Sequence, residues 1–184
     1  MTIDLQTNSF QHHISDTEPW KISMIDTGVD SMTGGRIKRI QKYVGNERFM
    51  LTYGDGVSNI NIPELIRCHD KNKSFCTLSA VHPPARFGAL EIQEDNKVEK
   101  FFEKPKGDGT WINGGFMVCE PEVFNYIEND TTIWEQDSLP RLAEDKQLSV
   151  FKHDGFWRPM DTLNDKYTLN KYWEEGTPLW KIWN

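Results

Sequence analysis

Two aspartates, each placed directly after a short apolar run, are the residues of this chain best suited to phosphate chemistry. Asp55 lies in Gly54-Asp55-Gly56 after an apolar stretch, and Asp161 lies in Pro159-Met160-Asp161-Thr162 after an aromatic one. Because strand ends converge at one edge of an α/β sheet, where ligands bind, we expect the two carboxylates to lie together. Two carboxylates suit a Mg²⁺ ion shared with substrate phosphates, although each aspartate alone fits a turn or a helix cap equally well.

A third polar segment lies between the two aspartates. Glu103 and Lys104 follow the apolar pair Phe101-Phe102, and the glycine-containing stretch Ile112–Phe116 comes shortly afterwards. This adjacent carboxylate and ammonium are the third candidate for site residues along the chain. The local alternative is a salt-bridged hairpin end before Pro105.

These motifs occur in an order that carries a family resemblance. The series is Ser-Met-Thr-Gly-Gly-Arg (31–36), Thr-Tyr-Gly-Asp-Gly (52–56), Pro-Pro-Ala-Arg-Phe-Gly-Ala-Leu (83–90), Glu-Lys-Pro-Lys-Gly-Asp-Gly (103–109), Ile-Asn-Gly-Gly-Phe (112–116) and Pro-Met-Asp-Thr-Leu (159–163). It resembles the glucose-1-phosphate cytidylyltransferases, sugar nucleotidyltransferases that make CDP-glucose and pyrophosphate from CTP and glucose 1-phosphate. The resemblance runs from about residue 18 to the end. The first motif and the terminal Pro-Leu-Trp-Lys-Ile-Trp look specific to the cytidylyl branch.

The resemblance implies a set of site residues. Asp55 and Asp161 would be the metal ligands for Mg²⁺, with Lys104 as a third catalytic residue. The nucleotide would be bound by Ser31, Thr33, Arg36 and Gly54. The sugar phosphate would be bound by Arg86, Gly88, Glu103, Lys104, Asn113 and Gly114.

The resemblance also implies an α/β, Rossmann-like nucleotidyltransferase fold with a mixed sheet flanked by helices. We expect residues 1–184 to form a single, partial domain, truncated at its N-terminus, because the family's Gly-rich triphosphate loop has no counterpart between Met1 and Trp20. The resemblance further implies a cytoplasmic homo-oligomer whose product is a precursor for deoxysugar or O-antigen synthesis.

The glycines of these motifs can also be interpreted from their local sequence. Gly34-Gly35 would leave backbone N–H groups open at a helix start, which is a ready anion site, while Ser31 and Thr33 either cap that helix or bond the nucleotide. Gly54 is either a turn glycine or a place where a side chain would block the nucleotide. For Gly88 and Gly114, the resemblance implies that they admit the sugar ring.

Composition narrows the function classes. The chain has 184 residues, which suits one domain, and 37% hydrophobic residues, which is enough for a core. A formal charge of −7 argues against nucleic-acid or anionic-membrane binding, and no apolar run reaches membrane length. The three cysteines show no ligand spacing, which disfavours a zinc site or a disulfide framework and fits a reducing cytosol.

Alternating and helical patterns predict the elements that position these residues. Strands are expected at 20–24, at 49–53 as a buried parallel strand, and at 74–81, 111–119, 148–151 and 155–160. Segments 87–92 and 98–102 are expected to form a hairpin. Helices are expected to begin at Thr33, after Asn61 with Glu64 as a capping pair, and after Thr162, with further helical segments at 121–127 and 139–144.

Two alternatives stay open. The enzyme could transfer a uridylyl or thymidylyl group instead of a cytidylyl group. The chain could also be a non-catalytic fragment, or a subunit of a larger assembly, that at most binds sugar phosphate.

Overall fold

A four-stranded mixed sheet organises the computed structural model, which describes residues 2–11, 13, 20–83, 89–94, 96–102 and 110–183. The strand order is β3 (Phe49–Thr52), β8 (Ile112–Cys119), β5 (Cys76–Val81) and β9 (Leu148–His153). β8 is antiparallel to both β3 and β5, while β5 and β9 are parallel. The predicted α/β fold with a mixed sheet is therefore confirmed.

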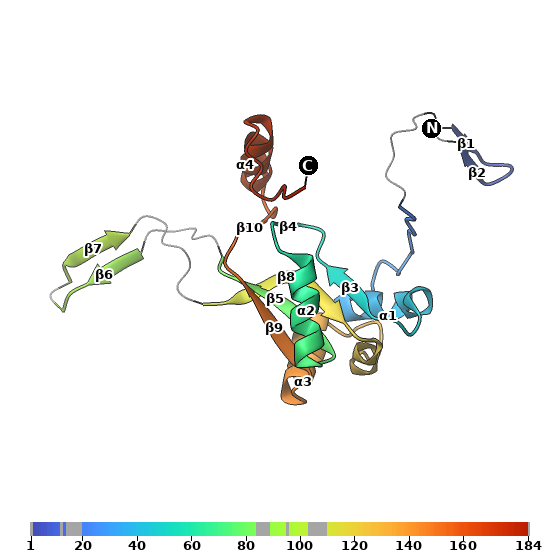
Figure 1. Cartoon of the computed structure of the whole chain (residues 1–184), viewed down its shortest axis with the longest axis horizontal. Helices are drawn as coiled ribbons and strands as arrows, with labels where there is room; N and C mark the ends of the chain where they lie inside the picture. The colour runs from blue at the N-terminus through green and yellow to red at the C-terminus, as the bar shows by residue number, and fades with distance from the viewer. Residues whose placement is uncertain are drawn as a thin grey trace.

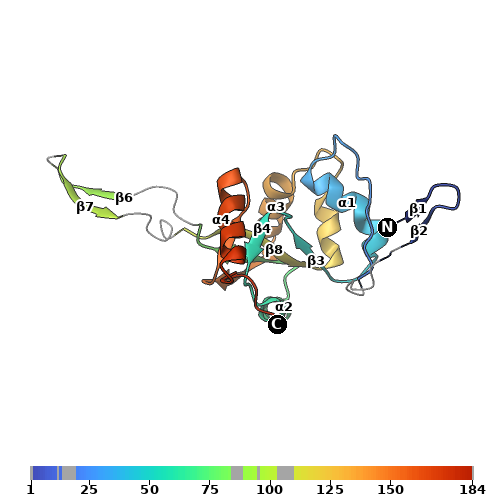
Figure 2. The same ribbon diagram turned by 90° about the horizontal axis from the view of Figure 1, so that it is seen from above.

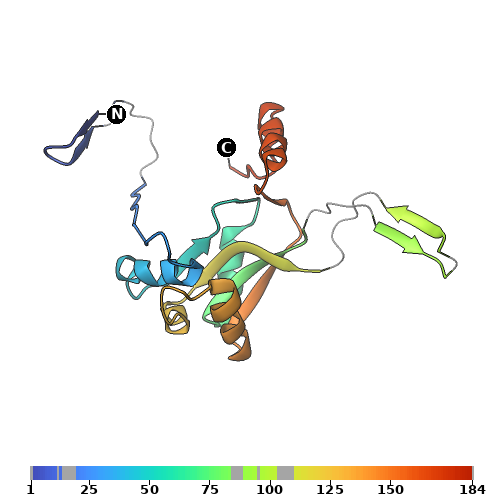
Figure 3. The ribbon, with the colours of Figure 1, turned by 180° about the vertical axis from the view of Figure 1, so that it is seen from behind.

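Helices cover both faces of this sheet (Figures 1 and 2). Helix α2 (Ile62–Asn72) packs on one face, against β5, β8 and β9. The other face carries α1 (Thr33–Val44), the 3₁₀-helix η1 (Pro121–Tyr126), the π-helical turn η2 (Trp134–Ser138) and α3 (Leu139–Glu144), as Figure 3 shows from behind. The core between these elements and the sheet includes Met117, Phe124, Trp134 and Leu142, all of them buried.

The helix caps follow the predicted chemistry. Asn61 accepts a hydrogen bond from the N–H of Glu64 at the start of α2. Thr162 and Asp165 form a reciprocal capping box at the start of α4 (Leu163–Glu174). Such caps satisfy backbone donors that a helix start leaves without partners, so they fix where each helix begins.

The described residues also form three smaller two-stranded ladders. β1 (Thr2–Asp4) pairs with β2 (Ser9–Gln11), and the predicted hairpin of β6 (Ala89–Ile92) and β7 (Val98–Phe102) is present, both antiparallel. β4 (Gly56–Ser58) pairs with β10 (Trp157–Pro159), which brings the two aspartate-bearing segments side by side.

Two strand predictions are wrong. Residues 20–24 form no strand, and Trp20 and Met24 are 74% and 94% exposed, because no described strand pairs with this segment. β3 is not a buried parallel strand, since it is an antiparallel edge strand on which Met50 is 55% exposed. Among the described residues, its second edge has no strand partner.

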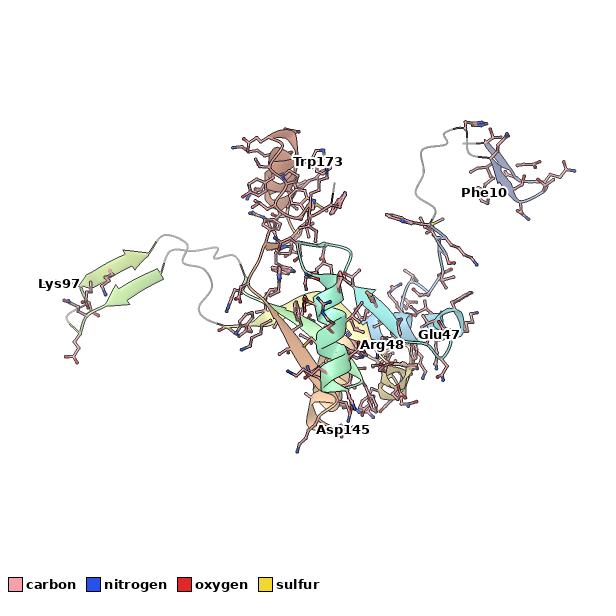
Figure 4. The ribbon with its side chains drawn as sticks, in the orientation of Figure 1. Phe10, Glu47, Arg48, Lys97, Asp145 and Trp173 are labelled. Atoms are coloured by element: carbon pink, nitrogen blue, oxygen red, sulfur yellow. The ribbon has the colours of Figure 1, made fainter. Side chains whose placement is uncertain are left out.

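The C-terminal segment packs through aromatic rings. Phe156, just before β10, contacts Tyr172 of α4 and Trp180, and Trp180 stacks on Trp173 with ring centroids 6.4 Å apart. Trp173 lies on α4, away from the sheet (Figure 4). Trp180 thus packs between Phe156 and Trp173, while Trp173 itself is 56% exposed.

A polar cluster lies at the end of the sheet remote from the aspartates. Arg48, labelled in Figure 4, forms ion pairs with Asp70 and Glu120. Glu120 also accepts from buried His69, whose other ring nitrogen bonds to Thr77. Each of these charged groups thus has a partner within the protein, so this end of the sheet is held together by internal polar contacts.

Candidate active site

The structure brings the two predicted metal ligands to the same end of one ladder. Pro159 of β10 is opposite Gly56 of β4, and the N–H of Met160 donates to the carbonyl of Asp55 at 2.8 Å. Asp55 accepts this bond through its own backbone carbonyl, Asp161 directly follows Met160, and both aspartates are exposed. The structure thus pairs the two aspartate-bearing segments, while the approach of the two carboxylates and their role as metal ligands stay predictions.

The donor set at this position fits a hard divalent cation. Two exposed carboxylates supply the one or two protein oxygens that Mg²⁺ ordinarily takes, and leave its remaining positions to phosphate and water. No group of three or more His, Cys, Asp or Glu side chains in the described part of the chain is arranged to hold a metal. A metal at Asp55 and Asp161 would therefore depend on substrate oxygens.

The start of α4 contributes positive character beside Asp161. Asp161 directly precedes Thr162, the N-cap residue, where the helix dipole favours negative charge. The cation nearest in sequence, Arg158, is committed to Asp165 at 3.0 Å. The Thr162 hydroxyl, together with Arg158, lowers the pKa of Asp165, so this carboxylate acts as a cap.

No contact among the described residues explains why position 54 is a glycine. A Cβ atom at Gly54 would meet no atom of the described residues within 4 Å, its chain neighbours aside. Its φ angle also lies outside the left-handed region that favours glycine. Neither a turn conformation nor packing therefore requires glycine here, which leaves the space above it for a ligand.

The side chains of the 31–36 motif hold their own loop together. Ser31 is buried, and its hydroxyl donates to the carbonyl of Thr27 at 2.6 Å. The guanidinium of Arg36 donates to Thr27 Oγ1 at 2.8 Å and to the carbonyl of Val29 at 3.1 Å. Neither Ser31 nor Thr33 caps α1, whose N-cap residue is Met32 with no side-chain bond. Their nucleotide-binding role stays a prediction.

The expectation of open amides at Gly34-Gly35 is wrong. Both N–H groups donate to the carbonyl of Thr132, at 3.0 and 3.3 Å. A Cβ atom on Gly34 would approach that carbonyl to 2.7 Å, and one on Gly35 would clash with the backbone of Asp130. The two glycines thus allow the start of α1 to pack closely on the loop before η2, and they offer no anion site.

Gly114 also has a structural reason to be glycine. A Cβ atom there would come within 2.7 Å of Ser79 Oγ and 2.8 Å of Val81 Cγ1, both on β5. Its carbonyl accepts from the indole N–H of Trp157 at 2.8 Å. The protein itself fills the space that was expected to admit a sugar ring, so that reason for Gly114 is wrong.

Asn113 is held in one orientation. Its Oδ1 accepts from the N–H of Gly115 at 2.9 Å, and its Nδ2 donates to the hydroxyl of Tyr53 at 3.1 Å. The remaining predicted sugar-phosphate residues, Arg86, Gly88, Glu103 and Lys104, lie outside the described residues.

Two residues near these motifs were not identified from the sequence. Tyr53 directly precedes Gly54, and its hydroxyl donates to Glu135 Oε1 at 2.7 Å. Burial, together with this bond to a carboxylate, raises the pKa of Tyr53, so the phenol remains a neutral donor. Glu135 lies in η2, far along the chain, and no local pattern distinguishes it from the other acidic residues.

Comparison with known proteins identifies the family. A family model described as "Nucleotidyl transferase" matches residues 2–176. The chain belongs to the nucleotidyl transferase family. The glucose-1-phosphate cytidylyltransferase of Salmonella typhi is 48% identical over 184 residues, which is 100% of this chain and 71% of that protein. A probable glucose-1-phosphate cytidylyltransferase of Bacillus subtilis is 41% identical over the same share of each chain. The resemblance noted from the motifs is confirmed.

A solved structure supports the fold of this nucleotidyl transferase. HddC from Yersinia pseudotuberculosis superposes with a TM-score of 0.56 at 23% identity, covering 77% of this chain and 62% of that one. This likeness concerns the arrangement of the elements alone. No helix within the described ranges has the length and apolar character needed to cross a bilayer.

Proposed function

We propose that this chain carries the transfer of a cytidylyl group from CTP to glucose 1-phosphate, which yields CDP-glucose and pyrophosphate. The proposal is supported by 48% identity, across the full chain, to an enzyme named for that reaction. The structural observation that carries it is the Met160–Asp55 backbone bond, which draws two distant aspartates to one ladder end.

The reaction needs alignment and charge stabilisation, with no covalent enzyme intermediate. A phosphate oxygen of glucose 1-phosphate attacks the α-phosphorus of CTP, and the bond to pyrophosphate breaks in line. Mg²⁺ held by Asp55 and Asp161 would supply neutralisation of the developing phosphate charge. The open face of Gly54 would admit the nucleotide, and Asn113 would be presented by its two fixed hydrogen bonds.

The wider setting follows from the same resemblance. We propose a cytoplasmic homo-oligomer whose product supplies deoxysugar or O-antigen synthesis. The substrate-binding roles of Ser31, Thr33 and Arg36 for CTP, and of Arg86, Gly88, Glu103 and Lys104 for the sugar phosphate, belong to this proposal.

Release of pyrophosphate from each of five nucleoside triphosphates, with glucose 1-phosphate and Mg²⁺, tests the function. CTP is expected to be the preferred donor. A preference for UTP or dTTP would replace cytidylyl transfer by one of the alternatives. Binding of glucose 1-phosphate by calorimetry, without turnover of any nucleotide, would indicate a non-catalytic sugar-phosphate binder.

The aspartates are tested by Asp55→Asn and Asp161→Asn. Each is expected to lower kcat/KM more than about a hundredfold, because removal of one charged metal ligand costs several kcal/mol of transition-state stabilisation. Asp70→Asn, which removes an exposed carboxylate paired with Arg48, is the matched control and should keep its activity. Mg²⁺-dependent rates equal to the control in either variant would reject the assignment.

A further inference from the structure

One carboxylate joins three segments that the sequence places far apart. Glu135 of η2 accepts from Tyr53 through Oε1 at 2.7 Å and from Thr33 through Oε2 at 2.7 Å. Thr33 begins α1 within the 31–36 motif, and Tyr53 directly precedes Gly54 and Asp55. Both oxygens of Glu135 are therefore used to hold residues beside predicted site motifs.

Tyr53 extends this connection to the predicted sugar-phosphate segment. Its hydroxyl accepts from Asn113 Nδ2 at 3.1 Å, while its own proton is directed to Glu135. Its ring packs over Gly115, where a Cβ atom would come within 2.7 Å of Tyr53 Cδ2, and its N–H donates to the Gly115 carbonyl at 3.0 Å. The ring, hydroxyl and backbone of Tyr53 are thus all fixed.

The directions of these hydrogen bonds are determined by the neighbouring groups. Thr33 Oγ1 accepts from the N–H of Trp134 at 2.9 Å, so its proton is available to Glu135. Asn113 Oδ1 accepts from the N–H of Gly115, so Nδ2 faces Tyr53. Thr33 therefore donates directly to the Glu135 carboxylate, while Asn113 donates to the Tyr53 hydroxyl, which in turn donates to Glu135.

The local fold supports a functional reason for this arrangement. Glu135 lies in a π-helical turn, a conformation often found as a single turn at functional sites. The preceding Trp134 is fully buried and anchors that turn in the core. A carboxylate placed on an anchored turn gives one defined geometry to the groups that bond to it.

We infer that Glu135 is a positioning residue that holds Thr33 of the nucleotide segment and, through Tyr53, Asn113 of the sugar-phosphate segment in one geometry around the Gly54-Asp55 turn. The inference rests on the proposed function, because it assigns the two segments to the two substrates. Glu135 contacts neither substrate in this account and acts through the hydroxyls that it binds.

Steady-state kinetics with both substrates tests the inference. Thr33→Val is expected to raise KM for CTP, Tyr53→Phe to raise KM for glucose 1-phosphate, and Glu135→Ala to raise both by about tenfold, the size of one to two hydrogen bonds to a charged group. Tyr126→Phe removes a tyrosine–carboxylate bond to Asp145, outside the network, and is the matched control.

A second measurement does not depend on turnover. The side-chain amide resonance of Asn113 in the ligand-free, ¹⁵N-labelled protein is expected to shift in Glu135→Gln and to stay in place in Tyr126→Phe. An inactive wild-type chain would reject the proposed function, while this amide would still report on the network. KM values and an Asn113 resonance that match the Tyr126→Phe control would overturn the positioning role.

Discussion

Replacement of Gly54 by alanine separates a ligand-facing glycine from a packing glycine. The added Cβ atom meets no described atom within 4 Å, and the backbone is outside the left-handed region. Alanine has fewer backbone conformations than glycine in the unfolded chain, so it loses less entropy on folding. Gly54→Ala is therefore expected to leave the free energy of unfolding unchanged or to raise it by about 0.4–1 kcal/mol. The same methyl group would occupy the space proposed for the nucleotide.

The expected functional effect is a rise in KM for CTP of about tenfold or more, which corresponds to about 1.4 kcal/mol of lost binding. Thermal unfolding and pyrophosphate-release kinetics are measured on the same protein. Gly114→Ala is the comparison, because its Cβ atom would come within 2.7 Å of Ser79 Oγ and should destabilise by about 1–3 kcal/mol. Wild-type KM for CTP in Gly54→Ala would refute the reasoning, as would a loss of stability equal to that of Gly114→Ala.

Two further predictions concern the elements that hold the site. Gly35→Ala is expected to lower stability by about 1–3 kcal/mol in urea unfolding, since its Cβ atom would clash with the Asp130 backbone, and stability equal to that of Gly54→Ala would contradict this. Asp165→Asn is expected to lower stability near neutral pH by about 1 kcal/mol through loss of the α4 cap. Since the folded pKa of Asp165 is lowered, its stabilisation is present above the ordinary pKa of about 3.9 and is lost as pH falls through the folded value. The difference in melting temperature between Asp165→Asn and the wild type should therefore shrink as the pH falls below about 3.9, and a difference that stays constant would argue against the cap.

Local sequence chemistry predicts the helices of this fold well and its sheet less well. The caps at Asn61 and Thr162 depend on residues three positions apart, so the sequence contains the whole interaction. The pairing of β3 depends on β8, more than sixty residues away, and the apolar run of β3 does not specify the direction of its partner. The alternation at 20–24 likewise shows which side chains a strand would bury, but it does not show whether another strand pairs with this segment.

The glycines show a similar division. The sequence marks Gly34, Gly35, Gly54 and Gly114 as places where a side chain is disfavoured, and gives no indication of what would meet it. In the structure, three of them face backbone or side chains of the protein, and a Cβ atom on Gly54 would meet none of the described atoms within 4 Å. A glycine motif therefore predicts a close approach, and only the fold distinguishes an approach by the chain itself from an approach by a ligand.

Glu135 belongs to the part of the candidate site that could not be predicted from the sequence. Its partners, Tyr53 and Thr33, are separated from it by 82 and 102 positions, and it is one of 28 acidic residues. The sequence predicts the two aspartates as site residues because each follows an apolar run at a turn, a pattern that places a carboxylate at a sheet edge. Glu135 instead acquires its partners from the packing of η2 beside α1, which the closely packed Gly34 and Gly35 make possible. The glycine pair thus contributes to the site indirectly, because it brings α1 near enough for Thr33 to reach Glu135.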